Sequence, residues 1–184
     1  RFAVGQKVNP IGLRVAVKKD WRSRWFSDKK NFGSLLNEDL EVRGYVKKEL
    51  ENAAVSEITI ERNANRIRVN VHTARPGVVI GRKGEAIERI RAELSKKTGK
   101  EVYLEIREVR DPDANAQLVA ENIALQMARR VSFRRAMKRA IKIAMDQGVD
   151  GIKIRVSGRL GGSELSRAEW YKQGRIPLHT LRAN

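Results

Sequence analysis

Residues 73–84 read Thr73-Ala74-Arg75-Pro76-Gly77-Val78-Val79-Ile80-Gly81-Arg82-Lys83-Gly84. Pro76 has a φ angle suited to the first turn of a helix and predicts a short helical turn over residues 77–80. The two glycines that follow interrupt this turn. Beyond them, apolar residues recur at helical spacing over residues 85–99, which predicts a second helix. Two helices separated by Gly-x-x-Gly therefore form the centre of the predicted fold.

Strands are predicted on both sides of these helices. Apolar and polar residues alternate in three segments, at residues 57–61, 66–72 and 102–107. The first two are expected to pair. Ahead of them we expect a helix from Asn37, its N-cap, to about Asn52, with Glu38 and Asp39 in the first turn. The predicted order is helix, strand, strand, short helix, Gly-x-x-Gly, helix, strand.

A second unit of mixed helix and strand is predicted after Arg110, beginning at the helix-start pair Asp111-Pro112. Helical spacing extends over residues 118–127 and 133–144, as one continuous helix or as two, and strands are expected at residues 152–156 and 164–171. The fold class is therefore α+β, in two successive units.

The segment Gly81-Arg82-Lys83-Gly84 has the composition of a phosphate-binding loop. Glycines at both ends remove the side chains that would hold a sugar-phosphate backbone away. The following helix offers unpaired N–H groups and the positive end of its dipole, and Arg82 and Lys83 add two positive charges. The alternative is a plain tight turn. A P-loop is excluded because Lys83 is followed by Gly84 rather than by Ser or Thr.

The composition points to a polyanionic partner. The 184 residues include 39 Lys and Arg against 22 Asp and Glu, a formal net charge of +17, and 41% are hydrophobic, enough for packed cores. The chain has no cysteine, which excludes disulfide scaffolds and thiol catalysis. No apolar run approaches the roughly 20 residues that a membrane helix needs. We therefore expect a soluble, intracellular protein bound to nucleic acid.

Catalytic signals are poor. His72 and His179 are the only histidines and lie far apart in the sequence, and no His-Glu-x-x-His, paired metal carboxylates or nucleophile elbow is present. We expect no enzyme activity, no cofactor and no metal ion, although 22 acids leave a spatial cluster open. A free RNA-binding regulator and a nucleic-acid-processing enzyme are the competing classes.

Positive charge is densest in a predicted helical stretch near residue 135. Residues 120–184 carry 14 Lys and Arg against 5 Asp and Glu. The cations of the dense stretch are Arg129, Arg130, Arg134, Arg135, Lys138, Arg139 and Lys142, with no acid among them. The positive charges of this stretch repel one another unless a polyanion neutralises them. We expect its opposite, apolar side to pack on a sheet and its basic face to meet RNA, with a membrane surface as the alternative.

The first 35 residues are expected to be an irregular arm in which basic and aromatic residues interleave. Trp21 and Trp25 allow two interpretations. Either the arm stacks on RNA bases, or the tryptophans pack on the domain that follows, as large aromatic side chains usually do.

These motifs together resemble one known family. The sequence is similar to bacterial small-subunit ribosomal protein three in five collinear blocks that span nearly the whole chain: Gly5-Gln6-Lys7-Val8-Asn9-Pro10-Ile11-Gly12-Leu13-Arg14, residues 73–84 quoted above, Phe133-Arg134-Arg135-Ala136-Met137-Lys138-Arg139, Val156-Ser157-Gly158-Arg159-Leu160-Gly161-Gly162, and Pro177-Leu178-His179-Thr180-Leu181-Arg182-Ala183.

The resemblance implies a domain plan. It divides the chain into an N-terminal basic and aromatic arm over 1–35, a type II KH RNA-binding domain over 36–110, and a C-terminal α+β ribosomal domain over 111–184. Family members usually begin with Met and Gly at the first block, so Arg1 to Val4 receive no role. They also continue past the position of Asn184 with another strand, which leaves an incomplete C-terminal sheet or a disordered tail as the expectations.

The resemblance also implies partners and site residues. It implies a structural protein of the small-subunit head, in the cytoplasm, that contacts rRNA, mRNA and the neighbouring small-subunit proteins ten and fourteen. Arg134, Arg135 and Lys138 match the family's basic residues at the mRNA tunnel entrance, which are linked to unwinding of structured mRNA. The Gly-x-x-Gly loop is expected to bind RNA. The other candidate rRNA contacts are Arg129, Arg130, Arg139, Lys142, Arg159 and Arg175.

Overall fold

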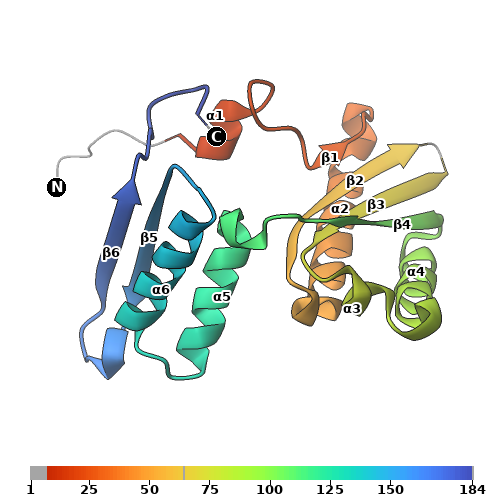
Figure 1. Ribbon diagram of the computed structural model, residues 1–184. Helices are drawn as coiled ribbons and strands as arrows, with labels where there is room; N and C mark the ends of the chain where they lie inside the picture. The colour runs from red at the N-terminus through yellow and green to blue at the C-terminus, as the bar shows by residue number, and fades with distance from the viewer. Residues whose placement is uncertain (1–7, 64, 184) are drawn as a thin grey trace.

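The computed structural model describes residues 8–63 and 65–183, which form two α+β units (Figure 1). The helices are α1 (Pro10–Arg14), α2 (Lys29–Glu49), α3 (Pro76–Ile80), α4 (Glu85–Thr98), α5 (Ala116–Ala128) and α6 (Phe133–Asp146). The strands are β1 (Ser23–Arg24), β2 (Val55–Asn63), β3 (Arg66–Thr73), β4 (Glu101–Glu108), β5 (Gly151–Gly158) and β6 (Arg167–Gly174). Short 3-10 turns are η1 (Glu51–Ala53), η2 (Arg82–Gly84), η3 (Pro112–Ala114) and η4 (Leu160–Gly162).

The first sheet has the strand order β1-β2-β3-β4. β2 and β3 are antiparallel, with Ile60 opposite Val69, whereas β3 and β4 are parallel, with Val69 opposite Leu104. A parallel pair needs a crossover connection, which α3 and α4 provide. The order predicted from the sequence is confirmed, and the Gly-x-x-Gly segment lies within the crossover.

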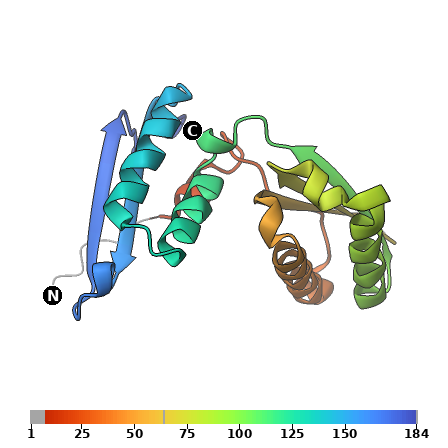
Figure 2. The same cartoon turned by 60° about the horizontal axis from the view of Figure 1, so that its bottom comes forward.

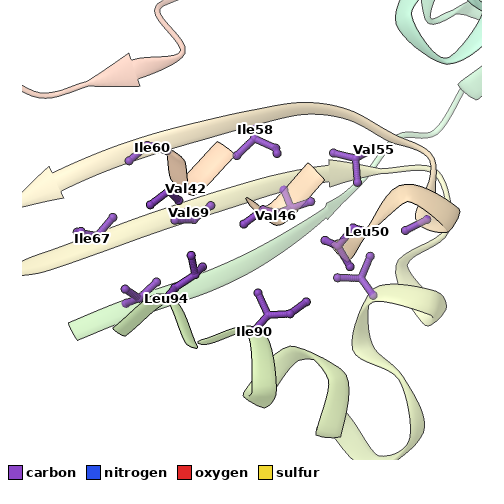
Figure 3. Packing of buried hydrophobic residues seen from close by; sticks show 14 residues of the cluster. Val42, Val46, Leu50, Val55, Ile58, Ile60, Ile67, Val69, Ile90 and Leu94 are labelled. Carbon is purple, nitrogen blue, oxygen red and sulfur yellow. The ribbon is translucent and has the colours of Figure 1, made fainter. Parts of the chain in front are cut away.

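One face of this sheet is covered by α2 and α4, and the core lies between the layers (Figure 3). Every second residue of β2 and β3 points into it, as the alternation predicts. Each fully buried Val, Leu or Ile contributes roughly 1.5–3 kcal/mol. The core residues are Val42, Val46, Leu50, Ala53, Val55, Ile58, Ile60, Ile67, Val69, Val71, Val79, Ile90, Leu94 and Val102.

Helix α2 begins earlier than the sequence predicts. Its N-cap is Asp28 rather than Asn37, so the prediction of irregular structure up to residue 35 is wrong for its last part, and also where α1 and β1 form. Gly33 lies inside the helix, where it costs about 1 kcal/mol relative to alanine, and tertiary contacts outweigh that cost. One such contact is the packing of Phe32 against Trp25, with ring centroids 5.4 Å apart.

Asp39 is the centre of a buried polar cluster, not a first-turn residue. Its carboxylate, fully buried, accepts hydrogen bonds from Ser23 Oγ at 2.8 Å and Trp25 Nε1 at 2.7 Å. Arg62 Nε donates to it from β2 at 2.7 Å. The arm, helix α2 and the first sheet are therefore joined at one carboxylate.

The C-terminal unit consists of α5, α6 and the antiparallel ribbon β5-β6. Two helices separated by a short turn are present, and both predicted strands are found, the second three residues later than expected. Figure 2 shows α6 lying along one side of the ribbon and α5 packed against α6. The opposite side of the ribbon carries no helix among the described residues.

The N-terminal helix α1 and the end of the chain lie side by side (Figure 1). Arg14, buried at the end of α1, donates hydrogen bonds to the backbone oxygens of Leu178, Thr180 and Ala183 at 3.0–3.2 Å. Arg14 also donates to the Pro10 backbone oxygen. These four hydrogen bonds to backbone carbonyls satisfy the buried guanidinium without a carboxylate. In the part of the chain that the structure describes, no helix is long and apolar enough to cross a membrane.

Candidate nucleic-acid interface

The Gly-x-x-Gly segment forms a tight turn between α3 and α4. Gly81 and Gly84 have φ angles of 71° and 83°, in the left-handed region that favours glycine. A Cβ atom on Gly81 would lie 2.7 Å from Ala86 Cβ, whereas a Cβ atom on Gly84 would meet nothing within 4 Å. Gly81 therefore allows the turn to pack on α4, and Gly84 leaves an open approach to the backbone.

The charge around this turn is more balanced than the sequence suggests. Arg82 is exposed at its tip, and the side chain of Lys83 lies outside what the structure describes. Glu85 and Glu88 lie in the first turn of α4, where their charge opposes that of a bound phosphate. The turn thus offers backbone geometry suited to a phosphate, while the formal charges of Arg82 and Lys83 are balanced by those of Glu85 and Glu88.

Helix α6 separates an apolar side from a basic side, as predicted. Ala136, Met137, Ile141 and Ala144 are buried on the side of α6 that packs against the ribbon and α5. The cations of α6 are all exposed: Arg134, Arg135, Lys138, Arg139 and Lys142. We call these five residues the α6 basic face. It can hold phosphates through charge alone, without reading bases.

Only one member of the α6 basic face has an ion pair among the described residues. Arg134 Nε lies 3.6 Å from Glu169 Oε2 on β6. Lys138 and Lys142 line a hollow of about 370 Å³ together with Tyr171 and Gln173 of β6. Tyr171 was missed by the sequence analysis because it lies in a different element, and only the position of β6 beside α6 brings it near.

Arg129 and Arg130 form the turn between α5 and α6, next to the basic face. Arg130 has a φ of 61°, the left-handed conformation that glycine normally adopts after a helix. The neighbouring Arg129 has an ordinary φ of −79°. An exposed arginine in a strained position suggests a use for its charge, because glycine would fit this backbone better.

We expect Arg130→Gly to stabilise the protein while weakening RNA binding. Glycine removes about 1 kcal/mol of left-handed strain, and the lost charge lowers affinity for any RNA. Thermal denaturation and RNA titration of the same preparation measure both effects. The control is Arg129→Gly, which should destabilise by about 0.5–1 kcal/mol because glycine is unfavourable in ordinary helical conformation. Equal signs for the two stability changes would contradict this expectation.

The remaining candidate arginines lie at opposite ends of the ribbon. Arg159 follows β5 and donates from Nε to the Ser163 backbone oxygen at 2.9 Å. Arg175 follows β6, where Gly174 pairs with Gly151 at the other end. Eight residues of strand place them roughly 25 Å apart. Arg159 lies at the Arg134 end of α6, since Glu169 pairs with Val156, so only Arg159 is near the start of the α6 basic face.

The structure places the two tryptophans of the arm in different surroundings. Trp25 packs on the first unit through Asp39 and Phe32, as the packing interpretation states. Trp21 is 63% exposed and lines a groove of about 510 Å³ with Lys18, Lys19 and Arg107. The groove lies between the arm, the uncovered face of the first sheet and the start of α5, so stacking on RNA stays open for Trp21.

The α6 basic face and the Gly-x-x-Gly turn belong to different units and form two separate surfaces (Figure 1). No group of three or more His, Asp or Glu residues suited to a metal ion occurs within residues 8–63 and 65–183. His72 lines the groove beside Trp21, and His179 is in the C-terminal segment.

Comparison with known proteins identifies both units. Residues 41–114 match the family model described as "KH domain", and residues 123–184 match "Ribosomal protein S3, C-terminal domain". The small ribosomal subunit protein uS3 of Akkermansia muciniphila is 58% identical, over 97% of this chain and 79% of the relative. The uS3 proteins of Desulforamulus reducens and Geobacter sulfurreducens are 54% and 55% identical, over 98% of this chain and 82% and 85% of the relatives.

Proposed function

Because the chain belongs to the family of small ribosomal subunit protein uS3, we propose that it binds small-subunit rRNA and that its α6 basic face contacts mRNA where the message enters the subunit. The family is one of ribosomal proteins, so the role is structural and RNA-binding rather than enzymatic. The KH domain and the α+β fold agree with this assignment.

The observation that carries the mRNA proposal is the charge arrangement of α6. Arg135 and Lys138 are exposed and without an ion pair in the described part of the chain, and Arg134 has one weak, exposed partner in Glu169. A row of cations that reads no bases suits a message of any sequence. The sequence contains no P-loop, so in this proposal the energy for separating mRNA strands comes from translocation by the ribosome.

The proposal also covers the domain boundaries of the protein, its other RNA contacts and its neighbouring proteins. We propose an arm over residues 1–35, a KH domain over 36–110 and a C-terminal domain over 111–184, supported by the two matched regions. In the cytoplasmic ribosome, the Gly-x-x-Gly turn, Arg129, Arg130, Arg139, Lys142, Arg159 and Arg175 contact RNA. Small-subunit proteins ten and fourteen are the proposed neighbours.

Alanine at Arg134, Arg135 and Lys138 together tests the mRNA contact. We expect normal assembly of the small subunit, slower translation through a stable mRNA hairpin, and nearly normal speed on an unstructured message. The reason is that strand separation alone depends on holding the released phosphates at this helix. Single-molecule or stopped-flow translation assays on the two messages measure the difference.

The control is alanine at Lys48, an exposed lysine of α2 in the other unit. It should leave hairpin translation unchanged. Failure of the triple variant to assemble, or equal slowing on both messages, would show that these residues anchor rRNA instead.

A further inference from the structure

The side of the β5-β6 ribbon that faces away from α6 carries a compact basic and aromatic patch. Residues on this side alternate with those that face the helix. Lys153 lies directly opposite Lys172, and Arg155 lies directly opposite Trp170. We call these four residues the outer ribbon patch. None of them was singled out by the sequence analysis.

We propose that the outer ribbon patch binds an unpaired nucleotide of rRNA, with its base stacked on Trp170 and its phosphates held by Lys153, Arg155 and Lys172. The proposal rests on the assembly into the small subunit proposed above, but on residues separate from the α6 basic face. Three features support it: the exposed ring of Trp170, the cations around that ring, and the purely positive charge on this side of the ribbon.

The ring of Trp170 is available for stacking. It is 54% exposed, although tryptophan normally hides most of its surface. The residues beside this pair on the same side are small, Ser157 on β5 and Ala168 on β6. They leave room for a flat ligand next to the indole. Every base has a π-face, so stacking on an aromatic ring accepts any unpaired nucleotide.

The cations surround this ring. Lys153 Nζ lies 5.5 Å and Lys172 Nζ 6.0 Å from the centroid of Trp170. Like charges directly opposite each other in a sheet are destabilising, so the Lys153–Lys172 pair costs stability in the free protein. A phosphate bound between the two ammonium groups would remove that cost.

The first sheet provides an internal comparison. Its uncovered side also carries many arginines, but acids on the same side pair with them: Arg22 with Glu57, Arg24 and Arg68 with Glu61, Arg66 with Glu101, and Arg107 with Glu105, at 3.1–3.9 Å. On the outer side of the ribbon no acid occurs, and within the described residues no carboxylate lies within 4.0 Å of its three cations. A sheet face that carries only positive charges is suited to binding a polyanion.

The same features favour rRNA over a protein or a moving message. The cores of protein interfaces are depleted in lysine, which makes up half of this patch. A duplex would present phosphates but no free base to Trp170. A base held by stacking resists movement, which suits a fixed rRNA nucleotide and would oppose translocation of mRNA. The α6 basic face, by contrast, exposes cations without a tryptophan.

Binding of the 184-residue chain to a labelled 12-nucleotide single strand and to a 12-base-pair RNA duplex tests the stacking. Trp170→Leu should lower affinity for the single strand roughly tenfold and leave the duplex nearly unaffected, whereas Trp170→Phe should retain most of the affinity. Lys153→Gln and Lys172→Gln should each reduce the slope of log affinity against log salt by about one. Equal loss on both RNAs, or no loss with a folded Trp170→Leu protein, would overturn the proposal.

Chemical probing of purified small subunits without mRNA tests the source of the nucleotide. In subunits that contain Trp170→Leu, we expect an unpaired rRNA nucleotide to become more reactive, while the alanine triple variant of α6 leaves that nucleotide unchanged. A change seen only when mRNA is bound, or none at all, would overturn the assignment to rRNA. The α6 proposal is tested by a different measurement, translation of the mRNA hairpin with the alanine triple variant. Failure of the α6 proposal can therefore be distinguished from failure of the outer ribbon patch proposal.

Discussion

Replacing Asp39 by alanine is expected to destabilise the protein by about 3–5 kcal/mol, because removing one partner of a buried ion pair leaves the other charge uncompensated. Arg62 would keep its guanidinium at 6% exposure with only Glu38, at 2.9 Å, as a remaining anion. Ser23 and Trp25 would lose their acceptor at the same time. Chemical denaturation measures the free energy of unfolding.

Two further variants make this result specific. Leu40→Ala changes the next residue of the same helix, but Leu40 is exposed, so its effect should stay within about 0.5 kcal/mol. The double variant Asp39→Ala/Arg62→Ala should be less destabilised than the sum of the single variants, because no unpaired charge remains. Additive effects would show that the two side chains do not act as a pair.

The arm should also be held less firmly in Asp39→Ala, since Ser23 and Trp25 lose their shared acceptor and keep the β1–β2 pairing and the Trp25–Phe32 contact. Phe26, 93% exposed, does not help to hold it. This connection explains why the sequence placed the arm wrongly. Gly33 and Asn37 favour a helix starting after residue 36, and the contacts that extend α2 back to Lys29 join residues far apart in the sequence.

Elements defined by local pattern were predicted well. The isoleucine and valine alternation of β2 and β3, and the proline and glycine around α3, depend only on neighbouring residues. The exposed cations of α6 followed from the 3.6-residue period in the same way. The left-handed Arg130 has no sequence signal, because glycine is the residue that normally announces this conformation.

Contacts between elements could not be predicted from one sequence. Glu169 pairs with Arg134, and Tyr171 lines the hollow beside Lys138 and Lys142, only because β6 lies beside α6. The strand alternation shows which residues share a side of the ribbon, but not which side α6 covers. The outer ribbon patch therefore became visible only when the structure placed the helix on the other side.

The affinity of the isolated protein for duplex RNA should fall by about a thousandfold when salt rises from about 50 to about 200 mM. This corresponds to neutralising roughly six phosphates, each releasing condensed counterions. Six exposed cations without an ion pair in the described residues adjoin one another on and before α6: Arg129, Arg130, Arg135, Lys138, Arg139 and Lys142. Little sequence preference is expected, because phosphates carry no base information.

Single substitutions show which cations carry this dependence. Arg135→Ala should reduce the slope of log affinity against log salt by about one. Arg134→Ala should reduce it by less, because Glu169 already offsets part of the Arg134 charge in the free protein. Filter binding or fluorescence anisotropy at four or five salt concentrations measures both slopes. A slope near zero for the unmodified protein would show that phosphates do not dominate binding, and strong preference for one short sequence would favour a free RNA-binding regulator.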